Sequence, residues 1–110
     1  MSQEESFKHL HSELGFSFSF YIIDHTDSLL LEPLNDEPRL VFLTDDQDFN
    51  AWSLQAAARA QRNDDVPDRP TVLYHVPVPH PPSVEGVQWE QAKFLCRLVM
   101  KPAPEPLQAA

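Results

Sequence analysis

The sequence predicts a small single α+β domain, an antiparallel sheet of about four strands with helices packed on one face. Three observations predict this class. The 110 residues fit one domain, and 42% hydrophobic with 23% charged residues is close to the globular average. Apolar residues recur at helical spacing in some segments and alternate in others. Short polar turns separate the early segments, as they do in an antiparallel meander.

The segment 16–23 carries the strongest strand pattern. Phe16, Phe18, Phe20 and Ile22 alternate with smaller or polar residues, and this period of two is typical of a strand with one buried face. Three phenylalanines on one face require a cover, so we expect this strand to organise the core. The predicted core consists of Phe18, Phe20, Ile22, Phe42, Trp52, Val72 and Leu95.

The other predicted elements complete the order α-β-β-β-α-β-α. Ser2 and Glu5 form a capping box, and Gly15 is a suitable residue to end the helix that follows. The predicted boundaries are a helix at 3–14, strands at 16–23, 29–34, 39–43 and 71–76, a helix from the second capping box at 44–47 to Asn63, and a helix at 84–100.

Two segments of the second half are less regular. The segment 84–100 fits both periods, and the helix propensity of residues 90–93 favours a helix. The prolines of 77–82 predict an extended spacer that stays outside the sheet. We therefore expect one domain over 1–101 and a disordered proline-rich tail over 102–110.

Charge and composition restrict the function. A net charge of −9 repels phosphate backbones, so direct nucleic-acid binding is not expected. A lone cysteine fits a reducing compartment, the N-terminus lacks a secretory pattern, and no apolar run could cross a bilayer. We expect a cytoplasmic protein without membrane contact.

The sequence offers no strong chemical motif. The potential zinc ligands are His9, His11, His75 and His80, together with Cys96 or a nearby aspartate, but their spacing matches no zinc motif. Around Cys96, the residues Phe94, Leu95, Leu98 and Val99 are apolar, which indicates a buried structural thiol rather than a nucleophile. The aspartates of 45–48 lack the glycine and distal glutamate of a calcium loop, and fit helix capping instead. We predict no catalytic residue, no metal and no cofactor.

Acidic residues gather in one part of the chain. From Asp24 to Asp48 there are eight acids and one arginine, which exceeds what turns and caps require. The predicted partner-binding residues are Asp24, Asp27, Glu32, Asp36 and Glu37. We expect a non-catalytic interaction module, namely an adaptor, chaperone or inhibitor of a basic protein.

Three other expectations remain open at this point. One alternative function is a nucleic-acid mimic that inhibits a DNA- or RNA-binding protein. Another is a small enzyme or a metal-binding protein. If the chain forms a homodimer, we expect it to use an exposed strand edge or the apolar back of 84–100.

Overall fold

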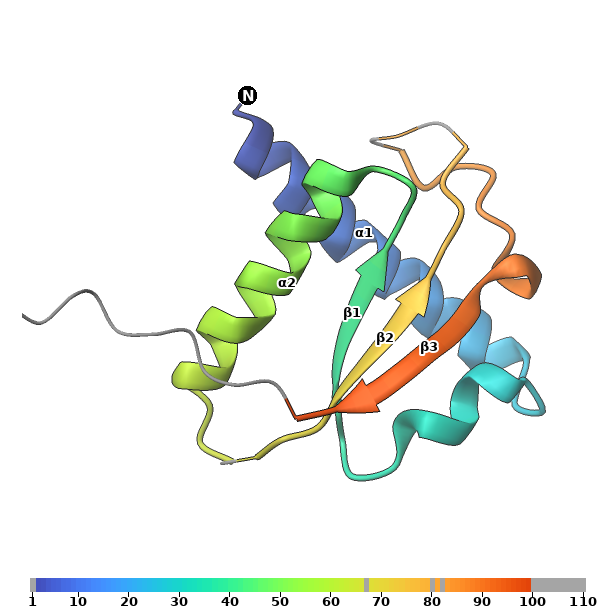
Figure 1. The fold of residues 1–110 in the computed structure, drawn as a ribbon. Coiled ribbons are helices and arrows are strands. Elements are labelled where there is room, and N and C mark those ends of the chain that lie inside the picture. Colours follow the sequence, from blue (N-terminus) through green and yellow to red (C-terminus); the bar gives the residue numbers. More distant parts are fainter. Residues whose placement is uncertain (1, 67, 80, 82, 100–110) are drawn as a thin grey trace, which may run out of the picture.

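The computed structural model describes residues 2–66, 68–79, 81 and 83–99, and shows a small α+β domain with a three-stranded mixed sheet (Figure 1). The predicted tail at 102–110 lies outside the described residues. In chain order the elements are α1 (Gln3–Asp24), the 3-10 helix η1 (Leu29–Leu34), β1 (Arg39–Leu43), α2 (Gln47–Arg62), β2 (Thr71–His75), the 3-10 helix η2 (Trp89–Gln91) and β3 (Lys93–Leu98).

The sheet has the order β1-β2-β3, and the predicted antiparallel sheet of about four strands is wrong. β1 pairs with β2 in parallel, with Val41 opposite Leu73, and α2 makes the crossover between them. β3 then pairs with β2 in antiparallel fashion, with Cys96 opposite Leu73. A parallel pair needs a crossover of a dozen or more residues, and α2 with its flanking loops supplies it.

α1 runs as one continuous helix through the segment predicted as the organising strand. Ser2 caps it, as predicted, by accepting a hydrogen bond from the Glu5 N–H. The inward side chains Leu10, Leu14 and Phe18 lie four residues apart, so the helical stripe simply continues past Gly15. A period of two was present in 16–23, but packing of this longer stripe on the sheet overrides it.

The segment 29–34 forms η1 instead of the predicted strand. Ser28 caps it through the Leu30 N–H. The buried Tyr74 hydroxyl donates a 2.6 Å hydrogen bond to the Leu30 carbonyl, and burial raises the pKa of Tyr74 to about 12. Pro33 lacks a donor for a ladder, and it fits a short helical segment that is held to the sheet by Tyr74.

The segment 84–100 was predicted as a helix, and this is also wrong. Residues 89–91 form only the short η2, and β3 follows directly. η2 is fixed to α1 by the Trp89 indole N–H, which donates a 2.8 Å hydrogen bond to the Ser17 hydroxyl. The backbone of β2 needs a partner on its second edge, and this long-range need outweighs the local helix propensity of 90–93.

Helices cover both faces of the sheet, not one face as predicted. α1 packs against Phe42, Val72 and Tyr74, and α2 packs through Ala57 against Val41 and Leu73 on the other face. The two helices meet at their N-terminal halves beside β1, as Figure 1 shows. This arrangement leaves the free edge of β1 between two helices and leaves β3 at the margin.

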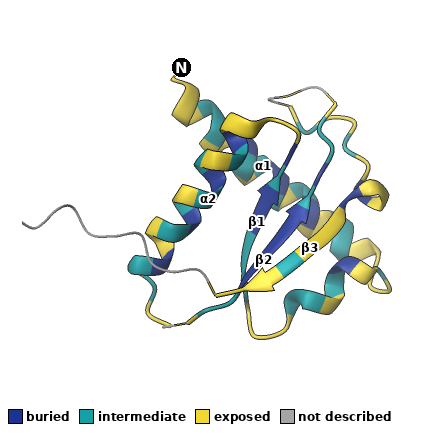
Figure 2. Ribbon diagram, viewed as in Figure 1, coloured by how far each residue is buried: buried dark blue, intermediate teal, exposed yellow. Residues whose placement is uncertain are grey.

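The predicted core is partly correct. Phe18, Phe42 and Val72 are buried, but Phe20 is 70% exposed and Leu95 is 48% exposed. Ile22 and Trp52 are half-buried at the edge of the core, which is dark in Figure 2 around β1 and β2. Phe20 lies outside because the helical period turns it away from the face that carries Phe18.

Candidate functional site

The five predicted partner-binding acids lie along the connection from α1 to β1. Asp24 ends α1, Asp27 lies in the following turn, Glu32 is in η1, and Asp36 and Glu37 form the turn before β1. All five are exposed. Of these five acids, only Asp36 forms an ion pair with a described residue, at 3.2 Å from Arg97 of β3.

The acidic stretch does not form a single surface. Asp45, Asp46 and Asp48 lie beyond the far end of β1, and the strand of five residues separates them from Glu37 by roughly 16 Å. Exposed charges are screened beyond roughly 8–10 Å at physiological ionic strength. Asp46 caps α2 and Asp45 contacts His75 at 2.9 Å. In the segment 24–37, by contrast, Asp24, Asp27, Glu32 and Glu37 have no ion-pair partner among the described residues.

An exposed apolar stripe adjoins these acids on α1. Phe16, Phe20 and Ile23 are 66%, 70% and 69% exposed, and their spacing of four and three residues places them on one face of the helix. Asp24 continues the same stripe, four residues after Phe20. We call Phe16, Phe20, Ile23 and Asp24 the outer stripe. The sequence contained this helical spacing, but the stronger alternating pattern concealed it.

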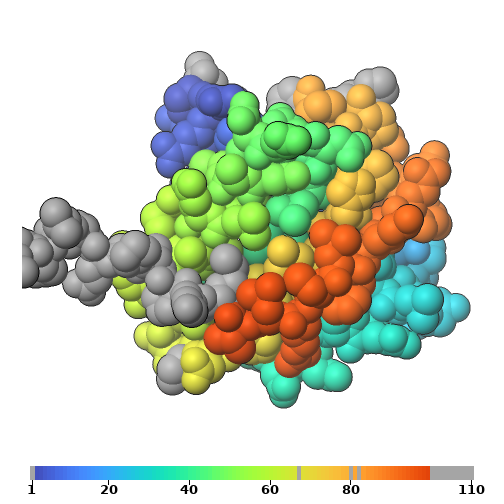
Figure 3. All heavy atoms as spheres, in the orientation of Figure 1, coloured from blue at the N-terminus to red at the C-terminus, as the bar shows by residue number. Residues whose placement is uncertain are grey.

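β3 forms a second exposed apolar region. Phe94, Leu95, Leu98 and Val99 are all between 39% and 51% exposed. Figure 3 shows β3 in orange across the face toward the viewer, with the segment of η1 beside it in teal. Cys96, which was expected to be buried, is half-buried next to the cluster of Val41, Ala57 and Leu73.

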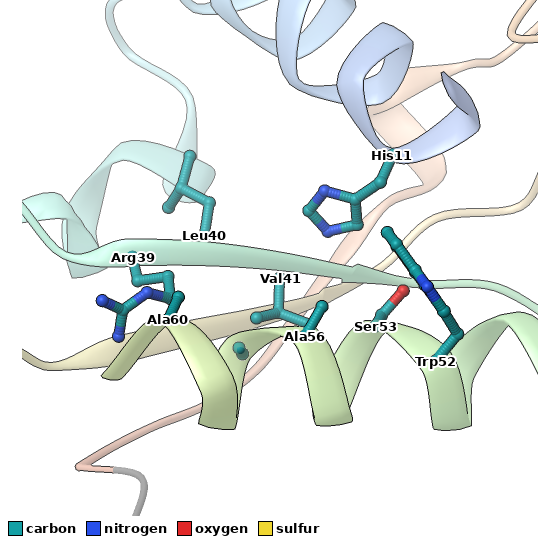
Figure 4. Close-up of a pocket in the computed structure, with 9 residues that line it drawn as sticks. His11, Arg39, Leu40, Val41, Trp52, Ser53, Ala56 and Ala60 are labelled. Carbon is teal, nitrogen blue, oxygen red and sulfur yellow. The ribbon is translucent and has the colours of Figure 1, made fainter. Parts of the chain in front are cut away.

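A pocket of about 280 Å³ lies between α1, the free edge of β1, and α2 (Figure 4). Its walls are mainly aliphatic. Polar groups lie at its two ends, with His11, Trp52 and Ser53 at one end and Arg39 at the other. The full lining is His11, Arg39, Leu40, Val41, Trp52, Ser53, Ala56, Ala57 and Ala60. Such a cavity with a few polar groups is the usual form of a small-molecule site.

His11 is held in one neutral form at this pocket. Its Nε2 accepts a 3.2 Å hydrogen bond from the Phe42 N–H, on the free edge of β1. Burial among the rings of Phe42, Phe49 and Trp52 lowers the pKa of His11. Because Nε2 is the acceptor, the ring proton lies on Nδ1, which is therefore a hydrogen-bond donor.

Arg39 at the other end is already paired. Its guanidinium donates to Gln61 and to Asp64, just beyond the end of α2. Arg69 also donates to Asp64, at 2.7 Å. Hydrogen bonds from the Arg69 side chain and the Val66 backbone, together with both arginine charges, lower the pKa of Asp64. Asp64 thus holds the start of β1 to the loop after α2. The guanidinium of Arg39 is already paired with this carboxylate, so it is not a free cation for a ligand.

The described residues contain no group of three or more His, Cys, Asp or Glu side chains arranged to hold a metal ion. Likewise, none of the helices among them has the length and apolar character to cross a membrane. No protein-family model, no curated protein and no solved structure matches this chain. The functional argument therefore depends on the two exposed surfaces and the pocket.

Proposed function

We propose that this chain is a non-catalytic protein-interaction module that binds a basic protein through the outer stripe and the acids of 24–37. The observation that carries the proposal is the position of three large, exposed apolar side chains next to Asp24 and Asp27, which have no ion-pair partner among the described residues. Large apolar patches rimmed by polar residues typically mark protein-binding surfaces. The carboxylates select a basic partner and accelerate its approach.

The nucleic-acid mimic is less well supported. A mimic needs its carboxylates in a regular row on one surface, to imitate the spacing of phosphates. Here the acids are divided between the two ends of β1, and Phe16, Phe20 and Ile23 interrupt the polar surface beside one group. An apolar stripe flanked by acids is better matched to a basic, amphipathic protein segment.

A first experiment identifies the partner. A photo-crosslinking amino acid replaces Phe20 in the native protein, and crosslinked proteins are identified by mass spectrometry from a cell extract. The matched control has the same amino acid at Gln55, an exposed position on α2. We expect a basic protein that crosslinks from position 20 and not from position 55. Equal products from both positions would contradict the proposed surface.

A second experiment separates the acids from the overall charge. Asp24→Asn with Asp27→Asn removes the charge that ends the outer stripe and the one that follows it, and Asp45→Asn with Asp48→Asn removes two charges at the far end of β1. We expect the first pair to slow association with the captured partner and to weaken its salt dependence, while dissociation changes little. If both pairs have the same effect, only net charge matters and the acids of 24–37 are a solubilising surface.

A further inference from the structure

The strongest remaining feature is the pocket between α1, β1 and α2. We propose that it binds a small uncharged molecule that has an apolar ring or branched body and one hydrogen-bond acceptor, such as a carbonyl oxygen. This proposal is independent of the protein-interaction role, because the pocket does not include the outer stripe.

The volume and lining define the apolar part of the ligand. A dry apolar cavity of about 150 Å³ holds a benzene ring, so a pocket of about 280 Å³ has room for a ring with a short substituent. The walls are formed by the aliphatic side chains of Leu40 and Val41 and by the methyl groups of Ala56, Ala57 and Ala60. The alanines keep α2 thin on this side, and a larger residue there would fill the space.

The polar end of the pocket defines the acceptor. Three buried side-chain polar atoms within the described part of the chain have no hydrogen-bond partner, and two of them, Trp52 Nε1 and Ser53 Oγ, belong to residues that line this pocket. Buried polar groups are nearly always paired, so each exception needs an explanation. The His11 ring lies at the same end of the pocket in Figure 4, with its Nε2 already bonded to the Phe42 N–H. The Trp52 and Ser53 groups can both donate to one acceptor.

The indole ring must move for a ligand to reach these donors. The Trp52 Nε1 and Ser53 Oγ atoms are closed off from solvent, but the Trp52 side chain as a whole is only half-buried. A carbonyl that enters the pocket would turn the ring aside and take the indole proton. The resonances of Trp52 therefore report occupation of the site directly.

The charges of the site favour an uncharged ligand. Arg39 is bonded to Asp64 and Gln61, and His11 is neutral because its Nε2 accepts from the Phe42 N–H. A carboxylate in the pocket would therefore lack a free cation and would enter a protein with a net charge of −9. Burial of an unpaired charge is strongly unfavourable.

The test uses two probes of the same shape, acetophenone and α-methylstyrene, which differ in having a carbonyl oxygen or a methylene group. Each is titrated into the isotopically labelled full chain and followed by nuclear magnetic resonance. We expect saturable shifts of the Trp52 indole N–H, the His11 ring and the Ala56 methyl group. Acetophenone should bind roughly 3–10-fold more tightly, as a single net hydrogen bond provides.

Three variants make the result specific. Ala56→Leu fills the pocket and should abolish saturable binding of both probes, whereas Ala51→Leu, the same change at an exposed position of α2, should leave binding intact. Ser53→Ala removes an unpaired hydroxyl, so it should fold normally and reduce the preference for acetophenone. The proposal is overturned if neither probe gives saturable shifts, if the two bind equally to the wild-type chain, or if Ala56→Leu binds as the wild type does.

Discussion

Gly15 offers the sharpest test of the long α1 helix. It lies in the middle of the helix, its φ is not in the left-handed region, and a Cβ added to it would have no neighbour within 4 Å. Glycine in a helix interior is less favourable than alanine by about 0.8–1.0 kcal/mol, because it loses more backbone entropy. Gly15→Ala should therefore stabilise the protein by about 0.5–1 kcal/mol.

The measurement is urea unfolding followed by tryptophan fluorescence. With an m value of roughly 1–2 kcal/mol/M, the midpoint of Gly15→Ala should rise by roughly 0.5 M. Gly86→Ala is the matched control, because Gly86 has a φ of +82°. An alanine there is strained and should destabilise the protein by about 1 kcal/mol or more. The same substitution is thus expected to have opposite effects at the two glycines of the chain.

A lower midpoint for Gly15→Ala would refute the continuous helix. If a helix ended at residue 14 and a strand followed, Gly15 would be the residue after the cap, with a positive φ. Alanine would then be unfavourable at both glycines, and Phe16 and Phe20 would no longer be assigned to the exposed face of a helix.

The remaining predictions concern the core, the pH dependence and self-association. Phe18→Ala should lower the free energy of unfolding by about 3–5 kcal/mol, whereas Phe20→Ala, at a side chain that is 70% exposed, should stay within about 0.5 kcal/mol by urea unfolding; similar losses would contradict the helical register. The lowered pKa of His11 means that the unfolded chain binds its proton first, so stability should fall as the pH drops below about 6.5, and His11→Gln should flatten this slope in unfolding experiments from pH 7 to 5. If the chain dimerises through β3, sedimentation should show a concentration-dependent dimer that Leu95→Lys with Leu98→Lys converts to a monomer, and a wild-type chain that stays monomeric would exclude the dimer.

The elements around β1 could be predicted from the sequence because local and long-range signals agree there. After Arg39, β1 is a continuous apolar run in which Val41 and Phe42 are buried, although the strand lies at one edge of the sheet. α2 begins at a carboxylate cap and has arginines in its last turn. The capping box predicted at 44–47 places the cap at Thr44, but the cap is Asp46, which accepts from the N–H groups of Asp48 and Phe49. The pairing direction of β1 and β2 has no such local signal, and α2 determines it by returning the chain to the same end of the sheet.

The two segments that were predicted wrongly, 16–23 and 84–100, each fit both the helical period and the strand period. In 16–23 the aromatic alternation is strong, but Phe18 also continues the helical stripe of Leu10 and Leu14. In 84–100 the helical and strand periods both fit the sequence, and the helix propensity of residues 90–93 favoured a helix where the structure has β3. The deciding contacts in each case join residues far apart in the chain, such as the Trp89 bond to Ser17 and the Tyr74 bond to Leu30.

The candidate sites divide in the same way. The acids of 24–37 could be found by counting charge, because turn residues stay exposed in almost any fold. The outer stripe could not, because Phe16 and Phe20 were assigned to the interior of a sheet. The pocket depends on how His11 of α1 meets Trp52 and Ser53 of α2 across β1, and no spacing within one segment indicates such a meeting.

The energetics of the outer stripe limit the kind of partner it can bind. Burying a large apolar side chain contributes about 1.5–3 kcal/mol, so Phe16, Phe20 and Ile23, each about two-thirds exposed, supply roughly 3–6 kcal/mol together. Association itself costs about 4–15 kcal/mol in lost motion, and exposed acids add more to the rate than to the affinity. The stripe alone therefore supports only weak binding. A stable complex must therefore also bury apolar surface next to the stripe. Leu29 is 75% exposed and follows Asp27 by two residues, so we expect the partner to cover Leu29 as well.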